Sequence, residues 1–458
     1  MIGLSPLTFH FVPMWKLLYN IGLLLAAPVI AGVLLAKPRC RPGFLQRMGW
    51  GVHPSDVGVS SRPLVWIHAV SLGEVVAVSP LVKALQARHP EFRYIVTTVT
   101  ETGREAVEQR LDGIAEHRYA PLDFSWAVAG MVKRLQPVLY VFVETELWPN
   151  MLWTLREHNV PSVLVNGRLS SRSFRRQDVP LIRSFYRVVL QTLTLCLMQT
   201  ERDRQRIVAL GAEPASTHVT GNIKFDQPVP EVQSDRSLRR SLGLAENEQL
   251  ILAGSTHQGE EELLVSAYQK IVQTYRDVVL MLAPRHIERV DRVEAMLREA
   301  KVVVQRKSQI RENLSGPRVV ILDTRGELAR AYREAVVAYV GGTLVPVGGH
   351  NLLEPAVWGT PVMFGPYTDH CTEIATLLSE AGGGRRVTGV EDLVVSIEEW
   401  LGQPDKRNRD GQVAKQVVSD NQGALMRSVE QIEQCLRTAP LYSKHSVTTG
   451  VGSLVAKP

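Results

Sequence analysis

Short apolar runs rich in β-branched residues alternate with segments of helical periodicity along most of this chain. PLVWIHA, YIVTTVT, VLYVFVE and PSVLVNG form one such series, and LILAGST, VVLMLAPRH, VVILDT, VVAYVGG and PVMFGP form a second. Strands that alternate with helices indicate βαβ units and parallel sheets. The sequence therefore predicts two doubly wound α/β domains in one chain.

The polar stretch PVPEVQSDRSLRRSLGLAENEQ separates the two series. We interpret it as the interdomain linker, and residues 441–458 as a loose tail. A chain of 458 residues, 45% of them hydrophobic, can bury a core in each domain. The predicted organisation is an anchor at 1–37, a first domain at 38–227, a linker with a second domain at 228–440, and the tail.

Residues 17–36 contain no charged side chain and are about as long as a helix that crosses a bilayer. Pro28 permits a kink or a shallow, tilted insertion. A buried core helix is one alternative, but the domains show no partner pattern for this stretch. A cleaved signal peptide is another, disfavoured because no small-residue cleavage pattern closes it. The positive-inside rule places the domains in the cytoplasm, since Lys16 precedes the stretch and Lys37, Arg39, Arg41 and Arg47 follow it.

The overall charge is only mildly basic, with 52 Lys and Arg against 46 Asp and Glu, which indicates no nucleic-acid partner. Arginine is concentrated in the segment 168–187, where Asp178 alone opposes Arg168, Arg172, Arg175, Arg176, Arg183 and Arg187. This segment suits a phosphorylated lipid or an anionic bilayer surface, although a solvated basic face is the simpler alternative. The four widely spaced cysteines indicate reduced, mostly buried thiols.

Ligands of open α/β sheets bind outside the carboxyl ends of the strands, and acidic residues follow two strands of the first series. In HAVSLGE, Gly73 allows a tight turn and Glu74 opens the next helix. Glu74 is a candidate general base, or else a carboxylate that interacts with the helix dipole. In VETELWPN, Glu144 and Glu146 share a side of an extended segment, so one can face the site with Glu74. Alternatively, they cap the helix opened by Pro149.

Anion-binding features follow the strands of the second series. LAPRH places the Arg285 guanidinium where it can hold a phosphate, and AGST and DTRGELA are turn-to-helix junctions. Gly341, Gly342, Gly348 and Gly349 are expected to clear side chains from a crevice. Asn351 then begins a helix whose Glu354 can accept hydrogen bonds from a ribose diol. No phosphate loop of an NTPase and no metal-ligand spacing are present, so we expect no metal site.

A set of motifs in this chain resembles, in the same order, the motifs of the 3-deoxy-D-manno-octulosonic acid (Kdo) transferases of lipopolysaccharide biosynthesis. The motifs are HAVSLGE, ETELWPN, NGRLS, GNIKFD, GSTH, LAPRH and GGHNLLEPA. The resemblance covers roughly residues 15 to 425. It implies a glycosyltransferase-B type fold, in which two Rossmann-like domains face a central crevice, with an N-terminal anchor in the inner membrane. It also implies CMP-Kdo as donor, the lipid A precursor lipid IVA as acceptor, and inversion at the anomeric carbon without a metal or cofactor.

Site roles follow from the same resemblance. It assigns Glu74 as general base, and Glu144 and Lys224 as the groups that stabilise the transition state. The implied CMP contacts are Pro284, Arg285, Arg325, Gly326, Glu327, Asn351, Leu352, Leu353 and Glu354. Three alternatives remain: a related lipid-acceptor glycosyltransferase that uses a UDP-sugar, a nucleotide-sugar epimerase, and a non-catalytic membrane-tethered binding protein.

Overall fold

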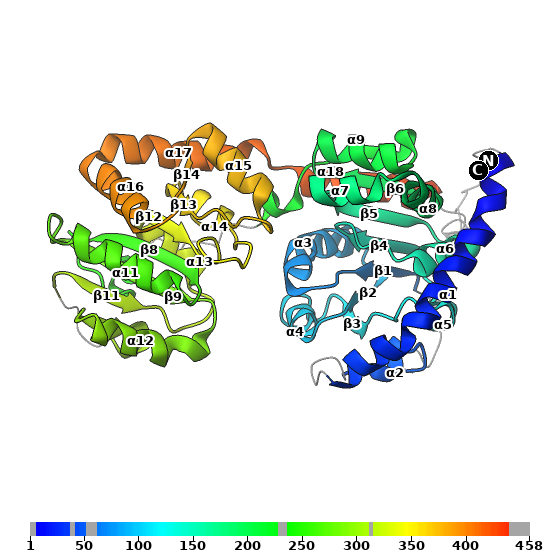
Figure 1. Ribbon diagram of the computed structural model, residues 1–458, viewed down its shortest axis with the longest axis horizontal. Coiled ribbons are helices and arrows are strands. Elements are labelled where there is room, and N and C mark those ends of the chain that lie inside the picture. Colours follow the sequence, from blue (N-terminus) through cyan, green and yellow to red (C-terminus); the bar gives the residue numbers. More distant parts are fainter. Residues whose placement is uncertain (1–5, 37–41, 52–61, 228–235, 311–314, 439–458) are drawn as a thin grey trace, which may run out of the picture. The chain divides into compact units, whose positions relative to one another are not determined.

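The computed structural model describes residues 6–36, 42–51, 62–227, 236–310 and 315–438. The chain forms two compact units, Met1–Gln227 with Gln422–Pro458, and Pro228–Asn421. Each unit contains one seven-stranded sheet in which every strand pair is parallel (Figure 1). The predicted pair of doubly wound α/β sheets is therefore confirmed, while the predicted tail lies outside the described residues.

The sheet of the first unit has the strand order β3-β2-β1-β4-β5-β6-β7. Side chains alternate between its faces: in β1, Val65 and Ile67 join one core and Leu64 and Trp66 the other. The strands are β1 Leu64–His68, β2 Arg93–Thr98, β3 Glu116–Tyr119, β4 Leu139–Val143, β5 Ser162–Gly167, β6 Leu195–Met198 and β7 Thr217–Val219. The helices are α1 Pro6–Ala36, α2 Phe44–Arg47, α3 Leu72–Arg88, α4 Glu101–Arg110, α5 Ser125–Leu135, α6 Pro149–Glu157, α7 Ser171–Gln177, α8 Pro180–Leu190, α9 Glu201–Leu210 and α18 Ala424–Thr438, with 3-10 turns η3 Pro214–Ser216 and η4 Ile223–Asp226.

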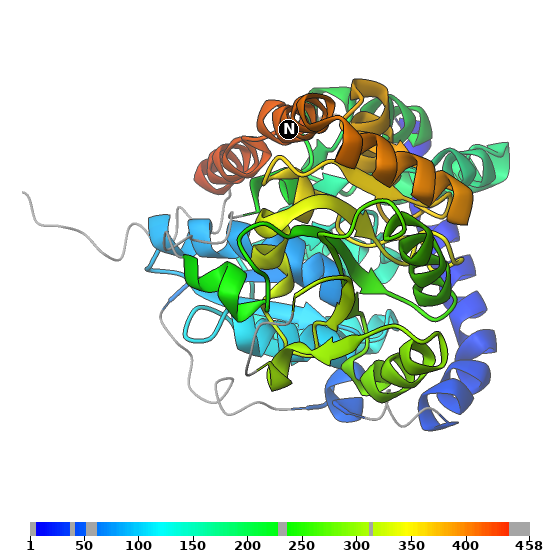
Figure 2. The ribbon, with the colours of Figure 1, turned by 90° about the vertical axis from the view of Figure 1, so that its left-hand side faces the viewer.

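The sheet of the second unit has the order β10-β11-β9-β8-β12-β13-β14. Helices α11, α12 and α16 pack on one face, through Leu264, Val293 and Ile397 (Figure 2). The strands are β8 Gln249–Thr256, β9 Val278–Pro284, β10 Val304–Arg306, β11 Arg318–Ile321, β12 Ala335–Val340, β13 Val362–Phe364 and β14 Gly384–Arg386. The helices are α10 Arg236–Ser241, α11 Glu260–Ile271, α12 Val290–Glu299, α13 Leu328–Ala331, α14 Leu353–Ala356, α15 Thr372–Ala381, α16 Val390–Gly402 and α17 Pro404–Asp420, with 3-10 turns η5 Ile287–Arg289, η6 Lys307–Gln309 and η7 Tyr332–Glu334.

The structure differs from the predicted organisation at two places. Part of the expected linker belongs to the second unit, because α10 leads into Leu242 and Leu244, which are buried in its core. The last helix, α18, belongs to the first unit and not to the second, where the sequence placed it. Val429 and Ile432 of α18 are buried in the core beside α3, so this helix finds its apolar partner on the first sheet.

A carboxylate of the first unit binds the start of α18. Asp226, at the end of η4, accepts hydrogen bonds from the backbone N–H groups of Gly423 (2.6 Å) and Leu425 (2.7 Å). Both donors lie at the helix N-terminus, where backbone N–H groups lack partners within the helix. Residues about 200 positions apart in sequence are thereby held together.

The N-terminal helix α1 fits a membrane anchor, since Pro13–Val33 is long and apolar enough to cross a bilayer. The sequence suggested that this stretch has no partner in the domains, but the helix does contact the first unit. Trp15 packs on Phe185 of α8 (ring centroids 5.6 Å apart), and Tyr19 packs on Trp153 of α6 (5.9 Å). The apolar side chains of Leu17, Leu24, Leu25 and Val29 on this helix are exposed. The helix therefore combines a face attached to the protein with an apolar face that is uncovered.

The basic residues expected to follow the anchor have different fates. Lys37, Arg39 and Arg41 lie outside the described residues. Arg47 is buried, donates to the carbonyl of Val99 (2.7 Å) and lies over the Tyr119 ring (4.6 Å). Its role is structural, and it does not contribute to a charged membrane surface.

We expect Ile432→Ala to lower the free energy of unfolding by about 2 to 5 kcal/mol, because it leaves a cavity between α18 and the first sheet. Glu430→Ala, on the exposed side of the same helix, should change it by less than about 0.5 kcal/mol. Chemical denaturation of both variants measures the difference. Equal, small effects would mean that α18 is not part of this core.

Candidate active site

The strand order of the first sheet reverses direction between β1 and β4. Ligands of open α/β sheets bind at such a switch point, outside the carboxyl ends of the strands. Glu74 lies in the first turn of α3, directly after β1, and Glu144 directly follows β4. The two carboxylates predicted from sequence therefore flank the switch point.

Glu74 is held at the start of its helix and is electrostatically perturbed. Its carboxylate accepts hydrogen bonds from the Val70 N–H (2.8 Å) and the Ser71 hydroxyl (2.9 Å). Burial raises the pKa of Glu74 to about 7, and the negative charges of Glu144 and Glu146 act in the same direction. A carboxylate with a pKa near neutrality can both take up and release a proton at physiological pH.

Gly73 does not form the tight turn that we expected. It lies within α3, and a Cβ atom added to it would come no nearer than 4.0 Å to Ser71 Oγ, its nearest neighbour. The glycine therefore leaves open space directly beside Glu74.

Glu144 and Glu146 do not share one side of an extended segment, so that prediction is wrong. Glu144 has a φ of 57°, in the left-handed region, and the chain turns there. Glu144 Oε1 pairs with Lys224 Nζ at 3.0 Å, while Glu146 accepts from the Trp148 indole N–H (3.2 Å). The salt bridge brings together the two groups that the family resemblance assigned to the transition state.

The alternative role of the two glutamates, as caps of α6, is filled by Asp123. Its carboxylate accepts from the backbone N–H groups of Asn150 (3.1 Å) and Met151 (2.9 Å), in the first turn of α6. The Tyr19 hydroxyl of α1 donates to the same carboxylate (2.9 Å). Burial raises the pKa of Asp123 to about 7. This cap could not be predicted from the sequence, because Asp123 lies in a separate segment that precedes α5.

Lys224 is positioned by a buried polar network. Asn222 Oδ1 accepts from the Lys224 N–H (3.0 Å), and Asn166 Oδ1 accepts from the Ile223 N–H (3.1 Å). Asn166, the first residue of NGRLS, lies at the end of β5 and is fully buried with a φ of 57°. Residues held in this region cost of order 1 to 3 kcal/mol each and concentrate at functional sites. The network explains how NGRLS and GNIKFD cooperate, which sequence spacing did not indicate.

In the second sheet the order reverses between β8 and β12. Pro284 ends β9, beside β8, and Arg285 follows with its side chain exposed. Within the described parts of the chain, Arg285 makes no ion pair with a carboxylate. Its guanidinium is therefore available to an anion at this edge of the sheet.

A buried carboxylate that the sequence did not single out organises the loops here. Glu260 accepts from the backbone N–H groups of His257 (2.9 Å), Gly342 (2.8 Å), Thr343 (3.0 Å) and Leu344 (3.0 Å). The Tyr339 hydroxyl donates to it as well (2.6 Å). Glu260 thus joins the segment after β8 to the glycine-rich segment after β12.

The glycines after β12 make room for the protein's own atoms, whereas we expected them to clear a crevice. A Cβ atom on Gly341 would lie 2.3 Å from the Ser255 carbonyl oxygen, where the chain segments after β8 and β12 approach each other. Additions at Gly342, Gly348 and Gly349 would meet His350, His370 and Cys371. These glycines are required for close packing of the loops.

The remaining predicted CMP contacts occupy varied environments. Glu327 pairs with Lys307 Nζ (2.7 Å), and Arg325, which is largely exposed, lies 3.6 Å from Glu288. Gly326 has a left-handed φ of 84°. The side chains of Leu352 and Leu353 are buried, so only their backbone is available to a ligand.

Asn351 does not begin a helix as expected. Helix α14 spans only Leu353–Ala356, and Asn351 Oδ1 accepts from the Leu353 N–H (3.1 Å) just before it. Glu354 is half-buried in the first turn and accepts from Asn351 Nδ2 (3.4 Å). The contacts between Asn351 and Glu354 arise within a tight turn.

Other side chains named from the sequence have simpler explanations. Cys196, Cys371 and Cys435 are free and buried, as predicted, and Cys40 lies outside the described residues. His68 is fully buried, which lowers its pKa to about 4. Across the described segments, no group of three or more His, Cys, Asp or Glu side chains is arranged to hold a metal ion.

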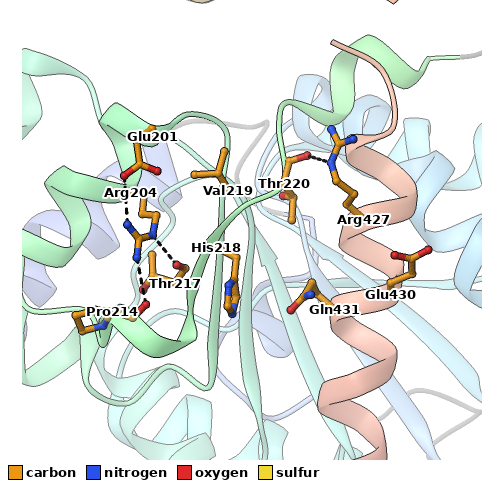
Figure 3. A pocket seen from close by; sticks show the side chains of 10 residues that line it. All are labelled: Glu201, Arg204, Pro214, Thr217, His218, Val219, Thr220, Arg427, Glu430 and Gln431. Atoms are coloured by element: carbon orange, nitrogen blue, oxygen red, sulfur yellow. Dashed lines mark hydrogen bonds and ion pairs between the residues drawn. The ribbon is translucent and has the colours of Figure 1, made fainter. Parts of the chain in front are cut away.

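A pocket of about 490 Å³ lies at the edge of the first sheet, between α9, β7 and α18 (Figure 3). None of the predicted site residues lines it. Its two arginines are already engaged: Arg204 donates to the Thr217 carbonyl and Arg427 to the Thr220 carbonyl. The pocket is therefore a poor candidate for an anion or reaction site.

The two parallel α/β sheets define the class of proteins with the glycosyltransferase-B fold. UDP-GlcNAc 2-epimerase from Neisseria meningitidis, bound to UDP-GlcNAc, has this fold; it matches with a TM-score of 0.58 and 13% identity, over 81% of this chain and 100% of that one. The family model described as 3-deoxy-D-manno-octulosonic-acid transferase (kdotransferase) matches residues 43–227.

Known 3-deoxy-D-manno-octulosonic acid transferases are similar over most of the chain. The protein from Haemophilus influenzae is 33% identical, over 92% of this chain and 99% of its own length. The protein from Bordetella pertussis is also 33% identical, over 81% of this chain and 87% of its own length. This chain belongs to the Kdo transferase family, and it is a glycosyltransferase.

We expect Glu260→Gln to lower the free energy of unfolding of the second unit by at least about 3 kcal/mol, because an amide cannot accept from every N–H group that the carboxylate serves. Glu262→Gln, on the same helix, affects only one hydrogen bond, from the Gly259 N–H (3.0 Å), which the amide oxygen of glutamine can still accept. It should cost about 1 kcal/mol or less. Denaturant titration compares them, and equal costs would contradict the role given to Glu260.

Proposed function

We propose that this protein transfers Kdo from CMP-Kdo to lipid IVA, with inversion at the anomeric carbon. Membership of the Kdo transferase family supports the transferred sugar. The observation that carries the proposed mechanism is the position of Glu74, whose pKa of about 7 is set by burial next to the Glu144–Lys224 pair.

In the proposed step, the ionised Glu74 carboxylate takes the proton of an acceptor hydroxyl. The hydroxyl oxygen forms a bond to the anomeric carbon of Kdo, and the bond from that carbon to the phosphate oxygen breaks, with its electron pair leaving on CMP. Lys224 carries a positive charge that can stabilise the negative charge that develops, and Glu144 fixes the direction of its ammonium group.

The donor is proposed to bind the second unit. Arg285 would contact the phosphate, with Pro284, Arg325, Gly326, Glu327 and the segment Asn351–Glu354 around the rest of CMP. A single phosphate carries less charge than a pyrophosphate, so fixed cations suffice for it and we propose that transfer needs neither a metal nor another cofactor.

The acceptor is proposed to be taken from the cytoplasmic side of the inner membrane, with α1 as the anchor. Arg172, Arg175 and Arg176 are exposed on α7, which suits the phosphates of lipid IVA or of an anionic bilayer. The apolar side chains of Leu181 and Ile182 are exposed next to them in sequence, on α8. Cationic and apolar groups together are typical of a surface that meets a membrane.

A direct assay tests the proposed function. The full-length protein, purified in detergent, is incubated with lipid IVA and CMP-Kdo, and products are weighed by mass spectrometry. We expect a mass increase of one or more Kdo residues. UDP-sugars in place of CMP-Kdo test the alternative glycosyltransferase. Conversion of a nucleotide sugar into its epimer without acceptor, resolved by chromatography, tests the epimerase. Turnover only with a UDP-sugar would overturn the proposal.

Glu74→Gln should lower kcat by about 10² to 10⁴, the usual contribution of a positioned general base. Glu74 acts only when ionised, so kcat/KM of the wild type should rise as the pH increases towards about 7. In the variant this rise should vanish. A pH profile of kcat/KM checks both effects, and a wild-type rate in the variant would show that Glu74 serves only the helix terminus.

Arg285→Ala should weaken CMP binding by about 1.5 to 3 kcal/mol, the usual worth of a hydrogen bond to a charged group. Arg276→Ala is the control, because Arg276 is exposed before the opposite end of β9. It removes the same charge and should leave CMP affinity unchanged. Isothermal titration calorimetry with CMP compares them, and equal affinities would move the donor site elsewhere.

Transfer should survive removal of divalent cations. An EDTA-treated, dialysed preparation should keep its rate within about twofold, because the proposed catalysis relies on fixed cations of the protein. Loss of activity that Mg²⁺ restores would contradict the metal-free mechanism while leaving the donor and acceptor unchanged.

A further inference from the structure

The four histidines of the second unit gather at the carboxyl edge of its sheet. His257 follows β8, His286 follows β9, and His350 ends the glycine-rich segment after β12. A Cβ atom on Gly348 would lie 3.0 Å from the His370 ring, so His370 packs against the same segment. None of these residues has a role in the proposed mechanism.

Two of the imidazoles are in direct contact. His257 Nε2 lies 2.8 Å from His350 Nε2, and the two rings are nearly parallel, at 4°. The contact spans the switch point between β8 and β12, where a ligand of such a sheet binds. Glu260 holds the two histidines in place, because its carboxylate binds the backbone of His257 and of the segment that leads to His350.

This contact limits how many protons the pair can hold. A hydrogen bond between two Nε2 atoms needs one ring to donate and the other to accept. The donating ring can take up a second proton on Nδ1, which keeps the contact and makes it charge-assisted. A proton on the accepting Nε2 would break the contact. The pair can therefore gain one proton, and one positive charge, without rearrangement.

The surroundings of the pair disfavour this additional proton. Burial lowers the pKa of His350 to about 4 and also lowers that of His257. The charged and titratable groups that face the pair are Glu260, Arg285, Arg289, His286 and His370. The charge of Glu260 raises the pKa of His257, but burial outweighs it. Arg289 is paired with Glu261 (2.9 Å), whereas Arg285 makes no ion pair with a carboxylate in the described parts of the chain, and its charge favours a neutral pair.

We propose that the His257–His350 pair is a proton-linked subsite for the phosphate of a nucleoside monophosphate, loaded with one proton when that anion binds beside Arg285. The proposal rests on the proposed function, because it assigns the pair to the donor site. The negative charge of the ligand raises the proton affinity of the pair, and the protonated pair in turn binds the anion more tightly. As the bond to phosphate breaks and its charge grows, the protonated pair would hold the leaving group.

The test is calorimetric titration of the full-length protein with CMP in buffers that differ in ionisation enthalpy. CMP itself titrates, with a second phosphate pKa of about 6, so the methyl ester of CMP is used in parallel, since its phosphodiester does not titrate near neutrality. Cytidine, which has no anion, shows whether the nucleoside alone causes an effect. Matched variants are His257→Asn, His350→Asn and, as a control in the first unit, His218→Asn.

We expect the wild type and His218→Asn to take up about one proton per CMP or methyl ester, and affinity to rise about tenfold for each unit of falling pH within the linked range. Cytidine should show no uptake, and both pair variants should lose it together with about tenfold in affinity. Absence of proton uptake in the wild type, or unchanged uptake in both pair variants, overturns the proposal. The proton uptake of the wild type tests the proposal even if a variant does not fold. Failure of CMP to bind the wild type would instead overturn the proposed function.

Discussion

In a sheet whose strands all run the same way, every strand ends at one edge, and residues far apart in sequence meet there because of topology alone. Both sheets of this protein are of this kind. Glu74 and Glu144 therefore meet after β1 and β4, and His257 and His350 after β8 and β12. Each pair flanks the point where strand order reverses, which leaves space at the edge that no crossover covers. The chemistry of both units depends on this one constraint: acidic groups that can take a proton in the first, and basic groups that can meet an anion in the second.

The loops at these edges are held by buried polar side chains. Asp123 binds the first turn of α6, Asn166 binds the turn before Lys224, and Glu260 binds the segments after β8 and β12. Each satisfies backbone N–H groups that no strand or helix partner reaches, and an unsatisfied buried group would cost about 1 to 3 kcal/mol. Left-handed residues at Glu144, Asn166 and Ser255 mark the same strand ends. Precise positions at the sites are thus maintained by interactions outside the reacting groups, which is why variants of these three side chains should affect stability and activity together.

The sequence predicted those features of the protein that depend on local residue patterns. Alternating strands and helices predicted both sheets, and the motifs after strands pointed to Glu74, Glu144 and Arg285, whose roles remain proposals. It did not predict Asp123, Glu260 or the His257–His350 contact, because each joins segments whose proximity arises only in the folded sheet. The left-handed turn at Glu144 was missed because the run VLYVFVE reads as extended to its end. Helix α18 was placed in the wrong unit because its apolar face indicates packing on a sheet but does not indicate which of the two sheets it packs on.

Helix α1, which fits a membrane anchor, is bonded to residues close to the candidate active site of the first unit. Tyr19 donates to Asp123, and Asn20 and Asn150 exchange amide hydrogen bonds of 3.0 Å. Asn150 lies in the first turn of α6, Asp123 caps that turn, and the helix begins only five residues after Glu144. A flexible tether would leave the domain free to rotate above a bilayer. A helix bonded in this way instead fixes the direction of its apolar face relative to α6, and with it the position of Glu144 relative to that face.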